Sequence, residues 1–251
     1  METASVKEIF DSDAGGYLDA YEDSSQNRSF IFQERRRIVF ELFRGISGVV
    51  LDVGCGPAVY TDGLVQAGCT IYGVDISPEM IALAKRRQFP GASFSVGNVE
   101  SLPFPSKMFD GILCVGVLEY LDRLDTAVGE MARVTKPGGS VVVTVPNGAC
   151  GLNRLDSTLR HAIRGIHRWS QGRLFRSAIT YPYAPKYWSP RVLERVLSKH
   201  GLHVEQRRFH IFRLTFLNKV SPKLSLSVMR SMNFVSSRFL GANLVIQARR
   251  T

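Results

Sequence analysis

The sequence predicts an α/β fold in which helices cover both faces of a mostly parallel sheet. Short apolar runs alternate with helical stretches from residue 49 onward. These runs are mostly apolar, as expected for strands that are buried on both faces. The chain has 251 residues, of which 45% are hydrophobic and 22% charged, so it can bury a core of this size. Ligands of such sheets bind at the carboxyl ends of the strands.

The first part of the sheet follows directly from this alternation. Five strands are predicted, at Val49–Val53, Thr70–Val74, Ser93–Val96, Gly111–Val115 and Ser140–Val145. Between them, helices are predicted at Thr61–Gln66, Pro78–Arg87 and Arg123–Thr135. Ser77 and Pro78 supply an N-cap and a first-turn proline for the second helix. The run Lys136-Pro137-Gly138-Gly139 is expected to end the third helix and to turn the chain into the next strand.

The flanking regions are less regular. We expect helices at Arg28–Phe43 and Pro190–His200, strands at His203–Phe212 and Ala242–Ala248, and amphipathic stretches within Asn147–Tyr187 and at Leu224–Leu240. The predicted organisation is an N-terminal helical segment (1–48), a ligand-binding core (49–146), a cap insertion (147–187) and a C-terminal part of the fold (188–251). A second insertion is expected at about residues 213–240.

Composition excludes several classes of protein. No apolar run approaches the ~20 residues that cross a bilayer, and no basic and apolar leader opens the chain. The four cysteines form no CxxC pair, which is typical of a reduced chain without a structural zinc site. A cytoplasmic location is therefore expected, with peripheral contact at the inner face of the membrane as an alternative.

The net charge of +10 is unevenly distributed. Residues 1–150 hold 13 lysines and arginines and 19 acids, a net charge of −6. Residues 151–251 hold 19 lysines and arginines and three acids, a net charge of +16. The basic part is expected to meet an anionic partner, which could be nucleic acid, a membrane surface or an acidic substrate.

The sharpest motif is the glycine loop at Val50–Ala58. Gly54 and Gly56 allow a tight turn and let a ligand lie against bare backbone. A nicotinamide cofactor requires a third glycine at position 59, which is Val59, and the nearby carboxylate of Asp52 would repel a pyrophosphate. Asp75 ends the second predicted strand, where a carboxylate can bind ribose hydroxyls. The combination predicts a nucleoside ligand with a cationic, phosphate-free tail.

Several ordered motifs resemble those of class I S-adenosylmethionine-dependent methyltransferases, in the small-molecule and lipid branch (methyltransferase type 11-like). They span about residues 30–146 and are Val50–Ala58, Gly73-Val74-Asp75, Gly97–Phe104, Phe109-Asp110, Leu118–Leu121 and Arg133–Gly139. The resemblance implies a Rossmann-like, doubly wound sheet of seven strands, with the last strand (near Ala242–Ala248) antiparallel and with basic helical cap insertions.

The resemblance also implies the residues that hold the cofactor. Asp52, Gly54 and Gly56 match the methionine side, and Asp75 matches the ribose-binding acid. The remaining matches are Ile76, Asn98 and Val99 beside adenine, Val115 with its neighbours beneath the sulfonium, and Tyr17 or Tyr21 as a lid. Asp52 could instead be a turn cap, Asn98 a plain loop residue and the two tyrosines packing residues.

Two positions depart from the family pattern. Ala58 stands where the family often has a third glycine, and its methyl group is tolerable if the backbone there is helical. Asn98 replaces the commoner acid at the adenine edge. The amide oxygen of Asn98 can still accept from the adenine amine, so weaker binding is expected.

No catalytic base stands out in the sequence. Weak candidates are His161, His167, Tyr181 and Tyr183, whereas His200, His203 and His210 fit surface or packing positions better. Glu119 and Tyr120 are interpreted as the start of a helix. No metal is expected, because Val145-Pro146-Asn147 lacks the acids that catechol-type enzymes carry there.

The acceptor is expected to be a small-molecule, glycan or lipid-like compound, with oxygen as the first choice of accepting atom. Leu159–Trp169 and Leu224–Leu240 each combine an apolar face with basic residues. These stretches are interpreted as cap helices packed on the domain, or alternatively as helices that contact an anionic membrane. The sequence is also compatible with an RNA methyltransferase and with a non-catalytic S-adenosylmethionine-binding protein. Nucleic acid is disfavoured because no RNA-binding module is present.

Overall fold

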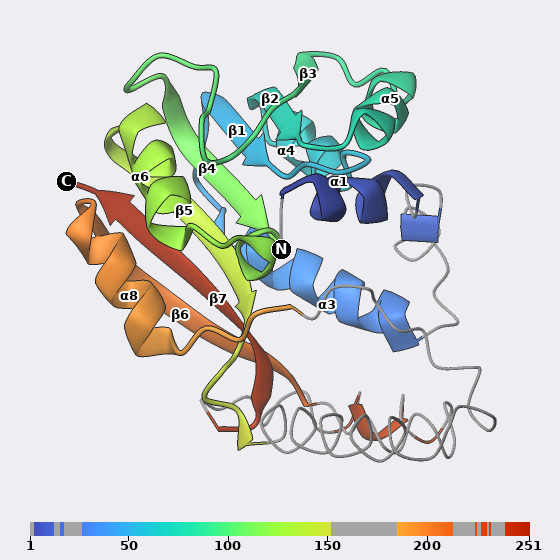
Figure 1. Cartoon of the computed structure of the whole chain (residues 1–251), viewed down its shortest axis with the longest axis vertical. Helices are drawn as coiled ribbons and strands as arrows, with labels where there is room; N and C mark the ends of the chain where they lie inside the picture. Colours follow the sequence, from blue (N-terminus) through green and yellow to red (C-terminus); the bar gives the residue numbers. More distant parts are fainter. Residues whose placement is uncertain are drawn as a thin grey trace.

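The computed structural model describes residues 3–12, 16–17, 27–151, 185–212, 224, 227–229, 231 and 239–251. They form a seven-stranded sheet of order β3-β2-β1-β4-β5-β7-β6 (Figure 1). The strands are β1 (Val49–Val53), β2 (Thr70–Asp75), β3 (Ala92–Val96), β4 (Phe109–Val115), β5 (Thr135–Pro146), β6 (Leu202–Phe212) and β7 (Gly241–Arg250). The predicted α/β fold is confirmed.

Strand direction follows the expected pattern. The pairs β1–β2, β1–β4, β2–β3 and β4–β5 are parallel. The final strand β7 lies between β5 and β6 and runs antiparallel to both, with Val143 opposite Ile246 and Arg207 also opposite Ile246. The predicted antiparallel last strand is therefore confirmed. The carboxyl ends of β1, β2 and β4 meet at one edge, where a ligand site is expected.

Each helix range predicted within the described residues is matched closely, and two helices without a predicted range are added, one near the N-terminus and one after β4. The helices are α1 (Thr3–Ser12), α3 (Asn27–Leu42), α4 (Thr61–Gln66), α5 (Pro78–Arg86), η1 (Leu118–Tyr120), α6 (Leu124–Val134) and α8 (Pro190–Lys199). Ser77 caps α5 as predicted, because its hydroxyl accepts the Met80 N–H at 3.1 Å. Ser189 caps α8 in the same way, accepting from Val192 N at 3.3 Å.

Two apolar layers make the sheet doubly wound. Successive strand residues point to opposite faces, so Leu51 and Val50 belong to different core clusters. On the Leu51 face the sheet packs against Met131 of α6 and Leu193 of α8. On the Val50 face it packs against residues of α3 and α4, among them Val39. These layers fix the strand ends on which the site is built.

The run Lys136–Gly139 is where the prediction was wrong. It does not form a separate turn, because α6 ends at Val134 and β5 begins at once with Thr135. Phe109 pairs with Thr135, and the register then shifts before Gly111 pairs with Ser140. Residues 136–139 have no strand-pairing partner on β4 or β7, so they form an irregular segment within β5, with Gly138 at φ +77°.

Most of the two predicted insertions lies outside the described residues. This applies to all of Leu159–Trp169 and to Leu224–Leu240 except Leu224, 227–229, Ser231 and the pair Phe239–Leu240. The proposed division into a core and two insertions therefore stays a prediction.

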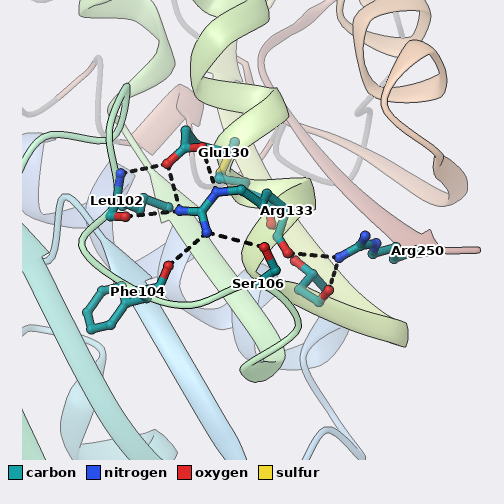
Figure 2. A network of polar contacts seen from close by, with 8 residues as sticks. Leu102, Phe104, Ser106, Glu130, Arg133 and Arg250 are labelled. Carbon is teal, nitrogen blue, oxygen red and sulfur yellow. Dashed lines mark hydrogen bonds and ion pairs between the residues drawn. The ribbon is translucent and has the colours of Figure 1, made fainter.

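A polar network holds the loop after β3 against α6. Figure 2 shows the Arg133 guanidinium between Glu130 and the carbonyl oxygens of Leu102 and Phe104, at 3.0 Å and 2.8 Å. Glu130 takes two hydrogen bonds from Arg133 and one from the Leu102 N–H at 2.8 Å. The Arg133 carbonyl in turn accepts from Arg250 at 3.0 Å, which ties β7 to the same point. The loop after β3, α6 and β7 thus meet at one residue.

We expect Arg133→Ala to lower the free energy of unfolding by about 1–3 kcal/mol, because charge-assisted hydrogen bonds are lost from a partly exposed site. Thermal unfolding measures this loss. Arg133→Lys keeps the positive charge but lacks the planar guanidinium, so its melting temperature should lie between those of the wild-type protein and Arg133→Ala. An unchanged melting temperature for Arg133→Ala would contradict a structural role for the network.

Candidate functional site

A cavity of about 390 Å³ lies at the carboxyl ends of β1, β2 and β4. This volume falls in the range of small-molecule sites, about 300–1,000 Å³. Figure 1 shows α1 lying across the ends toward which the arrows of β1 and β4 point. Nine of the ten predicted binding residues line this cavity: Tyr17, Asp52, Gly54, Gly56, Asp75, Ile76, Asn98, Val99 and Val115. Tyr21 lies outside the described residues.

The glycine loop forms the floor of the cavity. Gly54 has φ +69° and Gly56 has φ +51°, both in the left-handed region that favours glycine. The N–H groups of Gly54 and Cys55 both donate to the Val74 carbonyl, at 2.7 Å and 3.0 Å, which ties the loop to β2. A Cβ on Gly54 would lie 2.1 Å from Val117 Cγ2. Any side chain there would therefore displace the chain that follows β4.

Ala58 departs from what the sequence indicated. Its methyl group was expected to be tolerable in a helical backbone, but φ is +62° and α4 begins only at Thr61. The left-handed conformation costs an alanine roughly 1–2 kcal/mol. Its methyl is fully buried in a small cluster with Ile81, Ala84 and Phe94, and this burial offsets part of the strain. Packing against α5, rather than helical geometry, accommodates the methyl group.

Asp75 is held rigidly at the end of β2. Its Oδ2 accepts the Gly56 N–H and its Oδ1 accepts the Ser77 N–H, both at 2.9 Å. A carboxylate offers about four acceptor positions, so about two remain for a ligand. Burial raises the pKa of Asp75, while the backbone hydrogen bonds from Ser77 and Gly56 oppose the rise. The arrangement suits a ligand that presents a pair of hydroxyl groups.

Asp52 is a buried carboxylate with an unsatisfied oxygen. The residue is 1% exposed, and Oδ2 has no hydrogen-bond partner. Burial, assisted by the negative charge of Asp75, raises its pKa to about 7. An unpaired buried acceptor is costly, so a cationic or hydrogen-bond-donating ligand would be stabilised here. No backbone N–H donates to Asp52 Oδ2, which weakens the alternative interpretation of Asp52 as a turn cap.

Asn98 is a loop residue at the edge of the cavity. Its side chain lines the cavity, and its Oδ1 accepts the Glu100 N–H at 2.9 Å in a local turn. An amide oxygen has two lone pairs, so one remains for a ligand. The loop position is therefore fixed by Asn98 itself as well as by Arg133.

Aromatic residues of the N-terminal segment line the cavity. Phe10 of α1 lies edge-on to Tyr120 at 5.2 Å between ring centroids, and at 6.4 Å from Tyr17. Ser77 donates to Asp11 Oδ1 at 2.5 Å, which fixes α1 against the start of α5. Sequence reasoning named Tyr17 but missed Phe10 and Val6, which also line the cavity. The apolar spacing at the start of the chain is the only signal that could have pointed to them.

The described residues do not test the catalytic candidates named from the sequence. His161, His167, Tyr181 and Tyr183 lie outside the described residues. His200 contacts Asp125 at 3.1 Å near the surface, and His203 is exposed. His210 is buried in β6, and burial together with Arg35 and Arg37 lowers its pKa to about 3. Across the described residues, no group of three or more metal-ligating side chains gathers.

Glu119 was interpreted from the sequence only as part of a helix start, and the structure shows that its side chain is also buried. It does lie in the single turn η1, but it is 7% exposed and its Oε2 has no hydrogen-bond partner. Nothing in the sequence around Leu118-Glu119-Tyr120 signals burial of a carboxylate.

Comparison with known proteins gives a consistent picture. Residues 51–143 match the methyltransferase domain family. A demethylmenaquinone methyltransferase of Tropheryma whipplei is 34% identical over 145 residues, which cover 56% of this chain and 59% of that protein. A ubiquinone biosynthesis O-methyltransferase of a Bradyrhizobium strain is 31% identical over 135 residues, covering 50% and 53%. The chain thus spans little more than half the length of these curated relatives.

A solved structure agrees over the whole fold. Magnesium protoporphyrin IX methyltransferase from Synechocystis, solved with bound S-adenosylhomocysteine, superposes with a TM-score of 0.69 and covers 100% of both chains. The two sequences are 16% identical, so this likeness concerns the fold alone.

Proposed function

We propose that this chain transfers a methyl group from S-adenosylmethionine to a small-molecule, glycan or lipid-like acceptor, because residues 51–143 match the methyltransferase domain family and the fold is that of a solved methyltransferase. Oxygen is the proposed accepting atom. The single observation that carries the proposal is the buried Asp52 oxygen without a partner, in a cavity that also holds the rigid Asp75 carboxylate.

The residues present fit S-adenosylmethionine. Asp75 has acceptor positions left for the ribose hydroxyls, and Asp52 offers a negative charge to the cationic methionine end. Ile76, Asn98 and Val99 would hold the adenine, and the loop at Gly54–Gly56 leaves room for the methionine part. When bound, the cofactor supplies an electrophilic methyl group on a positively charged sulfur.

The protein's contribution is alignment and exclusion of water. Methyl transfer is an in-line displacement, in which holding the reacting atoms in line supplies much of the acceleration. Phe10, Tyr17 and Tyr120 cover the cavity with apolar surface, and Val115 and Gly116 form its wall at the end of β4. A cavity closed in this way strengthens the interaction between the Asp52 carboxylate and a cationic ligand.

Calorimetry with S-adenosylmethionine and S-adenosylhomocysteine tests the cofactor, and the expected result is saturable binding of both. Absence of binding would overturn the proposal. Profiling of metabolites and lipids from a deletion strain then identifies the acceptor as a compound lighter by one methyl group. The curated relatives named above act in quinone biosynthesis by their names, so quinol-type acceptors are the first to examine.

We expect Asn98→Asp to tighten cofactor binding about 3–10-fold, since a carboxylate accepts more strongly from the adenine amine and still accepts the Glu100 N–H. Asn98→Ala, which loses both interactions, should bind more weakly than the wild-type protein. Dissociation constants for S-adenosylhomocysteine provide the measurement. Equal affinities in all three proteins would place the adenine elsewhere.

Peripheral contact with an anionic membrane is a finer proposal for the same protein. Among the described residues, no helix has the length and apolar character needed to span a bilayer. The exposed large apolar side chains of the described residues include Leu224 at 51% and Phe239 at 67%, and the sequence places Lys223 and Arg238 next to them. Apolar side chains beside basic residues suit an interface with anionic headgroups.

Flotation with vesicles tests this contact. We expect the protein to float with vesicles that contain phosphatidylserine and to remain behind with phosphatidylcholine alone. Leu224→Ser combined with Phe239→Ser should abolish flotation while leaving S-adenosylhomocysteine binding intact. Equal absence from both vesicle fractions would contradict the proposed contact.

A further inference from the structure

The glycine loop is held from behind by Arg87, which is not one of the residues that line the cavity. One nitrogen of its guanidinium, Nη1, donates to the Pro57 carbonyl at 2.9 Å and to the Ala58 carbonyl at 3.3 Å. Neither of these two residues lines the cavity, but their neighbours along the chain, Gly56 and Val59, do. Arg87 therefore contacts the loop from outside the cavity, at a point between two residues that form its wall.

The two hydrogen bonds join the peptide groups on either side of the Ala58 Cα. Because peptide groups are planar, the relative orientation of these two depends on φ and ψ of Ala58. Ala58 has φ +62°, a conformation that is unfavourable for a residue with a side chain. A donor that binds both carbonyls at once favours this orientation over the alternatives. Arg87 thus stabilises the left-handed conformation of Ala58, in addition to the packing of its methyl group.

The side chain of Arg87 is itself fixed by the body of the domain. Arg87 is the C-cap residue of α5, and its N–H donates to the Ala84 carbonyl at 3.2 Å. Its guanidinium carbon lies 4.9 Å from the centroid of the Phe89 ring, in a cation–π contact. Phe89 packs in turn against the cluster that buries Ala58. The guanidinium is therefore positioned by α5 and the residue that stacks on it, as well as by the loop that it holds.

Helix α5 fixes two parts of the site from its two ends. At its N-terminus, Ser77 donates its N–H to the Asp75 carboxylate. At its C-terminus, Arg87 donates to the loop. The other backbone contact of Asp75, from the Gly56 N–H, does not involve Arg87. Loss of the Arg87 side chain should therefore leave Asp75 in place and change the path of the chain between Gly56 and Val59.

Building on the proposed function, we propose that Arg87 is a positioning residue for S-adenosylmethionine, which holds Ala58 in its left-handed conformation and so shapes the methionine side of the cofactor site. The hydrogen bonds of Arg87 go to the loop and not to Asp75 or Asn98, the residues proposed for ribose and adenine. Its effect is therefore confined to ligands that carry the amino acid part. S-adenosylhomocysteine has this part and adenosine lacks it.

Arg87→Met tests the proposal, because methionine keeps a long apolar side chain beside Phe89 and loses the donors. We expect binding of S-adenosylhomocysteine to weaken about tenfold and that of adenosine to change less than about twofold, since the lost charge-assisted bonds hold only the loop. Arg87→Lys keeps the charge and a donor without the planar guanidinium and should lose less affinity. Calorimetry measures both ligands at a temperature at which circular dichroism shows the variants folded. Should Arg87→Met not fold, Arg87→Lys carries the same comparison.

A second substitution tests whether Arg87 acts through Ala58. Glycine adopts a positive φ without a side-chain penalty, so Ala58→Gly removes the need for the hydrogen bonds from Arg87. We expect the double variant to recover most of the affinity for S-adenosylhomocysteine that Arg87→Met loses. A side chain that merely stabilised the fold would not produce this recovery together with an unchanged affinity for adenosine.

Arg86→Met is the matched control, because Arg86 is the neighbouring exposed arginine in the last turn of α5. It should bind both ligands as the wild-type protein does. The proposal is overturned if Arg87→Met binds S-adenosylhomocysteine as tightly as wild type, if both ligands weaken equally, or if Ala58→Gly recovers none of the loss. Failure of S-adenosylhomocysteine to bind the wild-type protein would instead overturn the proposed function, which separates the two.

Discussion

Asp75→Ala should weaken S-adenosylmethionine binding by roughly 10²–10⁴-fold. The carboxylate is expected to accept two ribose hydroxyls, and charge-assisted bonds of this kind contribute roughly 1.5–3 kcal/mol each. The substitution also leaves the N–H groups of Gly56 and Ser77 without their acceptor, so the glycine loop loses one of its contacts with β2 and keeps those to the Val74 carbonyl. Calorimetry measures the affinity, and near-unchanged affinity would refute the placement of the ribose.

Asp110→Ala is a matched control for Asp75→Ala. Asp110 also accepts a backbone N–H, that of Val49 at 2.9 Å, but it does so at the opposite end of β1. Its ion pair with Lys136 lowers its pKa, so its removal should lower stability. Affinity for the cofactor should stay within about twofold of wild type. Similar losses of affinity in both variants would indicate general unfolding rather than a lost ribose contact.

Asp52→Asn should raise stability and weaken cofactor binding at the same time. Burial holds the pKa of Asp52 at about 7 in the folded protein, above its ordinary value of 3.8. When the pKa of an acid is raised in the folded protein, the free energy of unfolding is highest at pH values below the ordinary pKa. It decreases as the pH rises toward the folded-state pKa of about 7. At pH 8 the ligand-free variant should therefore be more stable by about 1–4 kcal/mol, with the gain shrinking toward pH 4.

The same substitution should change how binding depends on pH. A cationic ligand needs the ionised carboxylate, so wild-type affinity for S-adenosylmethionine should fall by up to about tenfold per unit below pH 7. Asp52→Asn should bind at least tenfold more weakly and lose most of this dependence. Adenosine lacks the cationic tail, so its affinity should change little with pH and little on the Asp52→Asn substitution. A variant that is less stable than wild type at pH 8 would show that Asp52 has a partner in the folded protein.

Secondary structure and the position of Asp75 at the cavity were predictable from local pattern. The run Val49–Val53 and the helix Thr61–Gln66 match observed elements residue for residue, because an apolar strand followed by glycines leaves few alternatives. Asp75 could be placed because the end of a buried strand in a parallel sheet fixes where its side chain lies. The conformation of Lys136–Gly139 could not be predicted in this way, because the pairing of Thr135 with Phe109 overrides the turn preference of the local sequence.

The sequence by itself determined the α/β fold, the positions of its strands along the chain, and a loop suited to a nucleoside with a cationic tail. Spacing along the chain is enough for these, because strand ends and tight turns are local. Only the tertiary structure decided that Asp52 and Glu119 are buried with an oxygen unpaired, that Ala58 is left-handed, and that Phe10 lines the cavity. Burial and pairing depend on side chains distant in sequence, such as Arg35 and Lys186 around η1, and no local pattern encodes them.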